Sequence, residues 1–204
     1  EAAVESRPGV AWDDRGLVAR APAYRYADLC AALDERGTPF EDRVLDAAEL
    51  SLSHSYDLRD YQRAAVDAWR EHGDRGVVEL PTGAGKTVLA VDAIAVLGVP
   101  TLVVGPTIDL LEQWRRELET EFGVPVGQFG GGEQRQEAIT VSTYDSAYLR
   151  AEDVGGAFGL VVFDEVHHLG GEGYRDAARL LAAPARLGLT ATFERPDGAH
   201  EVVA

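Results

Sequence analysis

The feature that most restricts the fold of this 204-residue chain is an alternation of short, continuously apolar segments with amphipathic ones between residues 77 and 190. Apolar segments of this length are typical of strands buried on both faces of a parallel sheet. The expected strands are residues 77–80, 101–105, 139–142, 159–163 and 186–190. The expected helices between them are residues 86–97, 109–121 and 174–181. This order predicts an α/β fold with helices on both faces of the sheet.

Three local patterns complete the prediction for this region. The helix over residues 86–97 is expected to end at Gly98, because glycine adopts the left-handed conformation that terminates many helices. The glycine-rich residues 127–133 are expected to form a flexible loop. Two amphipathic helices are indicated by apolar residues at helical spacing. Their apolar faces are Leu58, Tyr61, Ala65 and Trp69 in the first, and Leu110, Leu111, Trp114 and Leu118 in the second.

Residues before about Ser55 follow a different pattern. An Asp-Asp-Arg-Gly turn signal within residues 10–18 favours a β-hairpin. A helix is expected over residues 25–36, and a further strand over residues 40–45. The chain is therefore predicted to contain a small α+β module over residues 1–55 and an α/β domain over residues 56–204.

Composition excludes several classes of protein. Hydrophobic residues make up 46% of the chain and there is no long apolar run, so we expect a soluble globular protein and not a disordered or membrane one. The only cysteine, Cys30, cannot form an internal disulfide or a thiolate zinc site, and we expect it to pack in a helix. These features favour a cytoplasmic protein.

The charge balance is strongly acidic, with a formal net charge of −16, and Lys86 is the only lysine. A net charge this far from zero is a device that halophiles use to stay soluble, which favours an archaeal, salt-accumulating cytoplasm. The alternative is a mesophilic acidic protein from a genome that favours arginine. On either interpretation, Lys86 is expected to be retained for chemistry.

A phosphate-binding loop is indicated by PTGAGKT at residues 81–87, between a predicted strand and a predicted helix. Gly83 and Gly85 allow backbone N–H groups to turn toward one point, and the helix N-terminus adds the positive end of its dipole. Lys86 supplies a compact ammonium for the outer phosphates, and Thr87 a hydroxyl for Mg²⁺. The full pattern has glycine where this chain has Leu80, so an incidental glycine-rich turn is the alternative.

A pair of carboxylates follows the strand predicted over residues 159–163. Ligands bind at the carboxyl ends of strands in open parallel sheets, which is where Asp164 and Glu165 stand. Asp164 is expected to hold Mg²⁺ through its water shell, and Glu165 to orient the attacking water. His167 and His168 could suggest zinc, but without a cysteine partner we expect His167 to relay contacts from the nucleotide. The alternative is two carboxylates that begin an ordinary loop.

Five motifs together resemble the XPB family of DNA repair helicases within superfamily 2, particularly its archaeal members. They are LRDYQ at 58–62, LPTGAGKT at 80–87, VSTYDSA at 141–147, FDEVHH at 163–168 and GLTATFER at 188–195. The resemblance extends from about Trp12 to the last residue. It implies that residues 56–204 are a RecA-like first helicase lobe with motifs Q, I, Ia, Ib, II and III. Residues 1–55 would be part of a damage-recognition module, or alternatively a structural cap on the lobe.

The resemblance also implies residue roles, carried over by position. Gln62 would read adenine, with Arg59 nearby, although a solvated helix position is the alternative for Gln62. The candidate nucleotide-binding residues are Arg59, Gln62, Thr82, Gly83, Ala84, Gly85, Lys86 and Thr87. The candidate catalytic residues are Lys86, Asp164, Glu165 and His167, and the candidate metal ligands are Thr87 and Asp164.

Four residues are implied to contact DNA: Pro106, Thr107, Thr143 and Arg195. Thr190 and Thr192 would couple the nucleotide state to the DNA. The alternatives for the first three are a strand-to-helix turn and a helix N-cap. Arg195-Pro196-Asp197 departs from the family's Arg-Glu-Asp motif, since proline fixes φ and removes a backbone donor, so unwinding is not inferred from it.

The implied function is ATP hydrolysis with Mg²⁺ that drives movement on, or opening of, duplex or forked DNA during repair. The alternatives are a translocase subunit of a restriction or nuclease system, and a damaged-DNA binding module with a nucleotide switch. Glu1 at the start, the absence of methionine and the ending HEVVA favour a piece of a longer product. We therefore expect a second RecA-like lobe to be missing and this piece alone to turn over little ATP. Because the chain is acidic, DNA affinity is expected to depend only shallowly on KCl.

Overall fold

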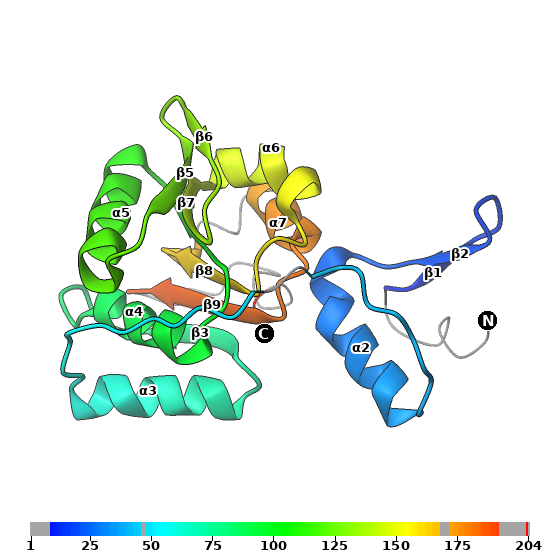
Figure 1. Ribbon diagram of the computed structural model, residues 1–204, viewed down its shortest axis with the longest axis horizontal. Helices are drawn as coiled ribbons and strands as arrows, with labels where there is room; N and C mark the ends of the chain where they lie inside the picture. The colour runs from blue at the N-terminus through cyan, green and yellow to red at the C-terminus, as the bar shows by residue number, and fades with distance from the viewer. Residues whose placement is uncertain (1–8, 46–47, 168–171, 192–202, 204) are drawn as a thin grey trace.

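The computed structural model describes residues 9–45, 48–167, 172–191 and 203. A small N-terminal part projects from one side of a larger lobe that is built around a sheet (Figure 1). In the described residues the sheet has the order β3-β9-β8-β4-β7-β5-β6, and every pairing except β5 with β6 is parallel. The strands are β3 (Arg75–Glu79), β4 (Thr101–Gly105), β5 (Val126–Gly130), β6 (Glu133–Arg135), β7 (Ile139–Thr143), β8 (Leu160–Asp164) and β9 (Ala185–Thr190). The predicted parallel α/β sheet is therefore confirmed.

Helices cover both faces of this sheet (Figure 1). One apolar cluster joins α3 (Asp60–Glu71), α4 (Lys86–Leu97) and α5 (Ile108–Phe122) to the sheet. A second cluster lies on the other face, under α6 (Tyr144–Val154) and α7 (Glu172–Leu180). Adjacent residues of one strand supply opposite clusters, as Val103 and Val104 of β4 do, because side chains alternate across a strand. None of the described helices is both long and apolar enough to cross a membrane.

The N-terminal part contains the predicted hairpin and helix. Strands β1 (Ala11–Asp13) and β2 (Val18–Arg20) pair antiparallel, and η1 (Ala23–Arg25) leads into α2 (Tyr26–Glu35). Gly37 follows α2 with φ of 61°, the left-handed conformation that ends the helix. The strand expected over residues 40–45 is wrong: these residues form no strand, and Phe40 and Val44 are 41% and 48% exposed. Residues 40–45 pair with no strand of the two described sheets, so apolar residues at both ends of this segment did not indicate a strand.

The loop expected over residues 127–133 is also wrong. Residues up to Gly130 belong to β5, which is fully buried, and the chain turns back at Gly131 and Gly132 into β6. Gly127 is glycine for a packing reason, because a Cβ there would lie 2.5 Å from the Arg135 carbonyl oxygen. Close approach of a neighbouring backbone explains Gly127, whereas Gly130, Gly131 and Gly132 have φ of 117°, 62° and 88°, which glycine adopts readily.

The buried face of α3 differs from the predicted one at one position, where Gln62 is buried in place of Tyr61. Tyr61 is 41% exposed, whereas Gln62 is 3% exposed and lies with Val66 and Trp69 on the buried face. A polar residue therefore occupies a core-facing position. Its hydrogen bonds, described below, explain how the amide is accommodated.

A segment over residues 48–58 runs from the N-terminal part along the lobe to the start of α3. The Leu50 N–H donates to the Gly98 carbonyl at 2.7 Å, and the Ser55 N–H donates to Glu121 at 2.8 Å. Leu50 and Leu52 pack against the cluster under α4 and α5. These contacts attach the segment to the ends of two helices.

Replacing Gly98 by alanine is expected to destabilise the protein by about 1 to 3 kcal/mol. Gly98 has φ of 58°, and an added Cβ would lie 2.6 Å from the Leu50 carbonyl oxygen. Gly123→Ala is the matched control, because Gly123 ends α5 with φ of 64° but an added Cβ meets nothing within 4 Å. Urea denaturation would measure both variants. Equal losses of stability in the two variants would show that the 48–58 segment moves away from the added Cβ without a measurable loss of free energy.

Candidate functional site

The phosphate loop joins β3 to α4, as predicted. Gly83 and Gly85 have φ of 79° and 82°, a conformation that residues other than glycine rarely adopt. An added Cβ at Gly83 would face open space, whereas at Gly85 it would lie 2.4 Å from the Gln62 amide nitrogen. Gly85 is the N-cap of α4 and no side chain caps this helix end, so its first N–H groups remain available to an anion. The loop therefore fits a phosphate group.

Gln62 holds the phosphate loop in place. Its side-chain oxygen accepts from the Arg59 N–H at 2.9 Å, and its amide nitrogen donates to the carbonyls of Ala84 and Gly85 at 3.0 and 3.2 Å. The Tyr61 hydroxyl also donates to the Ala84 carbonyl, at 2.7 Å, and accepts from Arg59. α3 thus supports the loop through Gln62, which was expected to read adenine, and through Tyr61, which was expected to lie on an apolar face.

The carboxylates lie at the end of β8, opposite the loop. Lys86 Nζ is 4.0 Å from Glu165 Oε1, and these side chains are 13% and 31% exposed. Glu165 has φ of 50°, a strained conformation for a residue other than glycine. Such strain is typical of functional sites. The two motifs predicted to act together are therefore brought together in space.

Asp164 is held more tightly than its neighbour. It is 6% exposed; its Oδ2 accepts from Trp114 Nε1 at 2.7 Å and its Oδ1 from the Glu165 N–H at 2.9 Å. Burial raises the pKa of the Asp164 carboxyl, and the hydrogen bond from Trp114 opposes that shift. The helical spacing of Trp114 predicted only a core position, because spacing does not reveal which polar atom an indole N–H reaches.

His167 connects the carboxylates to the last strand. Its Nδ1 lies 3.4 Å from Glu165 Oε2 and 3.4 Å from the hydroxyl of Thr190. Thr190 is fully buried at the end of β9, beside the end of β3. Glu165, His167 and Thr190 therefore form a chain of polar contacts from the end of β8 to the end of β9. Thr192, Arg195 and His168 lie outside the described residues.

The donor set at this site suits magnesium. The described residues contain no cluster of three or more histidine, cysteine, aspartate or glutamate side chains that could hold a metal ion. Mg²⁺ needs no such cluster, because it keeps several waters and binds one or two protein oxygens together with substrate phosphates. Asp164 and the partly buried Thr87 hydroxyl could supply those oxygens.

The candidate DNA-contacting residues follow two neighbouring strands. β4 and β7 pair with Gly105 opposite Thr143. Thr107 is the N-cap of α5 and accepts from the Leu110 N–H at 3.3 Å, and Thr143 is the N-cap of α6 and accepts from the Ser146 N–H at 3.1 Å. Pro106 is half-buried just before α5. The capping role considered as an alternative is therefore present at both threonines, and α6, which was not predicted, begins there.

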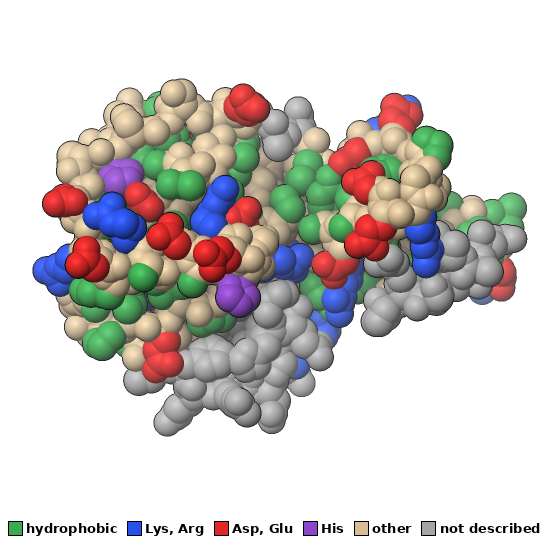
Figure 2. All heavy atoms as spheres, turned by 90° about the horizontal axis from the view of Figure 1, so that it is seen from below, with side chains coloured by type: hydrophobic (Ala, Val, Ile, Leu, Met, Phe, Trp, Pro, Cys, Tyr) green, Lys and Arg blue, Asp and Glu red, His purple; other side chains and the backbone are tan. Residues whose placement is uncertain are grey.

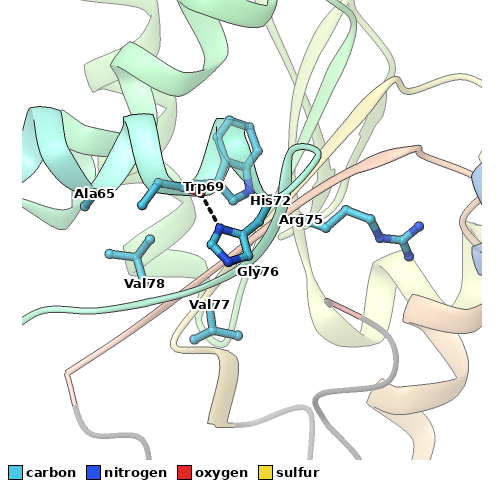
Figure 3. A pocket seen from close by; sticks show the side chains of 8 residues that line it. Ala65, Trp69, His72, Arg75, Gly76, Val77 and Val78 are labelled. Atoms are coloured by element: carbon cyan, nitrogen blue, oxygen red, sulfur yellow. Dashed lines mark hydrogen bonds between the residues drawn. The ribbon is translucent and has the colours of Figure 1, made fainter.

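A hollow of about 340 Å³ lies between α3 and β3, and no residue of the phosphate loop or of the carboxylate pair lines it (Figure 3). Trp69, His72 and Val78 contribute to its lining. The hollow is therefore separate from the candidate site.

Comparisons with known proteins agree with this geometry. A SWI2/SNF2 ATPase core from Sulfolobus solfataricus in complex with dsDNA superposes with a TM-score of 0.63 at 19% identity, covering 79% of this chain and 38% of that one. The Hef helicase domain of Pyrococcus furiosus gives a TM-score of 0.57 at 22% identity, covering 71% of this chain and 35% of that one. These similarities establish the fold. The fold and the order of motifs define a RecA-like lobe of the superfamily 2 class.

The family follows from the sequence comparisons. The chain belongs to the family described as Type III restriction enzyme, res subunit, whose model matches residues 55–195. Residues 1–44 match the Xeroderma pigmentosum group B helicase damage recognition domain. The DNA 3'-5' translocase XPB2 of Sulfurisphaera tokodaii is 46% identical over 96% of this chain and 44% of its own length. The DNA 3'-5' helicase XPB of Mycobacterium tuberculosis is 37% identical over 75% of this chain and 30% of its own length.

The predicted XPB resemblance is therefore confirmed. The chain spans less than half the length of both of these relatives.

Proposed function

We propose that this chain binds MgATP between the phosphate loop and β8 and acts within an XPB-like, ATP-dependent DNA helicase or translocase of repair. The observation that carries the proposal is the 4.0 Å separation of Lys86 Nζ and Glu165 Oε1. It brings an ammonium suited to the outer phosphates next to a carboxylate suited to orient water. Both lie at the carboxyl edge of the parallel sheet, where nucleotides bind in such folds.

Each residue of the site has one proposed role. Lys86 binds the outer phosphates, aided by the uncapped N–H groups at the start of α4. Asp164 and Thr87 hold Mg²⁺, which neutralises phosphate charge when it is bound. Glu165 orients the attacking water, and His167 relays the phosphate state to Thr190. Gln62 exchanges its loop hydrogen bonds for contacts with adenine.

DNA is proposed to bind at the N-termini of α5 and α6. The threonine caps accept from backbone N–H groups, and the Thr107 hydroxyl carries a proton that it can donate to a DNA phosphate. The Thr143 hydroxyl donates to Ser146 Oγ at 2.9 Å and would exchange that hydrogen bond for one to a phosphate. Acidic side chains are scattered among basic ones on the face of the lobe seen in Figure 2. Contacts through helix ends and hydroxyls need no basic surface, so we propose that DNA binding loses little affinity between low and molar KCl.

The organisation proposed for the chain is a damage-recognition module over residues 1–55 followed by the first RecA-like lobe over residues 56–204. A second lobe would supply an arginine to the transferring phosphate and close over DNA. Relatives from Halobacterium salinarum and Haloarcula marismortui are 40% and 38% identical. Together with the net charge of −16, they support a halophilic archaeal protein in the cytoplasm.

ATP turnover by the full-length gene product tests this proposal. It would be measured at low and at molar KCl without DNA, with intact duplex, with forked duplex and with lesion-bearing duplex. Stimulation by DNA is expected, with a further increase for the lesion. An ATPase that no DNA stimulates would contradict the proposal.

Two further measurements separate the proposed helicase from its alternatives: strand displacement, and lesion binding by a variant that cannot hydrolyse ATP. A translocase that serves a nuclease would hydrolyse ATP on duplex without displacing a strand from a short tailed substrate. A damaged-DNA binding module with a nucleotide switch would bind lesions equally well whether or not ATP can be hydrolysed.

A further inference from the structure

Two aromatic side chains from different helices donate hydrogen bonds to one residue, Asp164. Trp114 Nε1 donates to the Asp164 carboxylate at 2.7 Å, and the Tyr144 hydroxyl donates to the Asp164 backbone carbonyl at 2.9 Å. Trp114, Tyr144 and Asp164 are 2%, 1% and 6% exposed. Water therefore competes little for these bonds, and both the side chain and the backbone of Asp164 are fixed by aromatic donors.

These donors stand on the two helices whose first turns carry the proposed DNA contacts. Trp114 lies about two turns into α5, which begins after its cap Thr107. Tyr144 is the first residue of α6 and follows its cap Thr143 directly. Each helix therefore has a candidate phosphate-contacting cap at one position and a donor to Asp164 at another. A helix is stiff over two turns, so a shift of its N-terminus also moves the aromatic donor.

We infer that Trp114 and Tyr144 are positioning residues through which DNA contacts at α5 and α6 set the orientation of Asp164 toward magnesium. This inference rests on the proposed function, which gives Asp164 its metal role and Thr107 and Thr143 their DNA role. Trp114 fixes which way the carboxylate turns, and Tyr144 fixes the end of β8 that carries it. DNA would thus favour the arrangement of Asp164 in which Mg²⁺ and ATP bind together.

The test compares Trp114→Phe with wild type in the full-length protein. Phenylalanine retains most of the packing but removes the N–H donor to the buried carboxylate. Equilibrium binding of a fluorescent ATP analogue would be titrated with Mg²⁺, with and without duplex DNA. The half-saturating Mg²⁺ concentration is expected to rise about ten- to a hundredfold, as removal of a hydrogen bond to a charged group implies. Binding of the analogue in EDTA is expected to stay unchanged.

Trp69→Phe is the matched control. Trp69 is also buried, at 4% exposure, and its Nε1 donates to the Arg186 carbonyl at 2.9 Å, away from the candidate site. This variant is expected to lower thermal stability without changing the Mg²⁺ dependence of nucleotide binding. If both tryptophan variants raise the Mg²⁺ requirement equally, Trp114 acts only through general packing and the inference fails.

Tyr144→Phe keeps the inference testable if Trp114→Phe folds poorly. It removes a single hydroxyl, and it is expected to reduce the stimulation of ATP turnover by duplex several-fold. Unchanged stimulation in Tyr144→Phe, or an unchanged Mg²⁺ titration in Trp114→Phe, would overturn the inference while the proposed function stands. Wild-type protein that no DNA stimulates would instead refute the proposed function.

Discussion

Replacing Lys86 by alanine is expected to reduce ATP turnover by about a hundred- to a thousandfold, the usual cost of losing one preorganised donor to a developing charge. Lys86 is the first residue of α4, and its side chain is only 13% exposed. Its ammonium therefore lies in a partly desolvated position, between the uncapped helix end and Glu165. In the alanine variant, a bound phosphate and the Glu165 carboxylate would both lose the positive charge that compensates their negative charges.

The composition of the chain provides a direct second measurement. Because Lys86 is the only lysine in these 204 residues, it is the only side chain among them that an amine-reactive reagent modifies at its amine. MgATP is expected to protect Lys86 from modification, as mass spectrometry of the peptide would record. Lys86→Arg is the informative control: it retains the charge in a larger planar group, and it is expected to restore little turnover. If alanine supports near-normal turnover, or if MgATP gives no protection, this lysine does not bind phosphate.

Most elements of the lobe could be predicted because the relevant signals are local, whereas β5, β6 and α6 were not predicted. α4 is predicted with its observed bounds, since glycine stands at both of its ends, Gly85 before it and Gly98 after it. The central strands β4 and β8 are almost continuously apolar and are buried along their whole length, as burial on both faces of a sheet requires. The positions of the glycine-rich loop and of the carboxylate pair could be predicted because each directly follows a predicted strand.

The errors occurred where a distant partner determines the structure. Gly127 lies in a buried strand, and the backbones of Arg135 and Glu137 leave no room there for a Cβ. No local sequence pattern shows that approach. A strand was expected over residues 40–45, but this segment pairs with no strand in the described part of the chain. Trp114 has the spacing of a core residue, and its N–H reaches Asp164 only through the packing of α5 on the sheet. A sequence pattern indicates which face of a helix is buried, but it does not indicate which polar atom of another element a buried side chain will contact.

Replacing Glu165 by glutamine is expected to reduce ATP turnover by about a hundred- to ten-thousandfold, the range over which a positioned general base contributes. Glutamine has nearly the same size and should preserve the strained backbone at this position, where φ is 50°. It does not act as a base toward the attacking water. Binding of MgATP is therefore expected to persist, because the proposed phosphate and metal contacts come from Lys86, Thr87 and Asp164.

Asp164→Asn is the control that separates the two carboxylates. Its side chain accepts from Trp114 and from the Glu165 N–H, so loss of its charge weakens both hydrogen bonds as well as the proposed attraction for Mg²⁺. This variant is expected to lose Mg²⁺-dependent nucleotide binding together with turnover, whereas Glu165→Gln should lose turnover alone. A titration with a fluorescent ATP analogue, followed by single-turnover hydrolysis, distinguishes these outcomes. If Glu165→Gln also binds MgATP poorly, Glu165 holds the metal or the nucleotide, and the division of labour proposed for the pair is wrong.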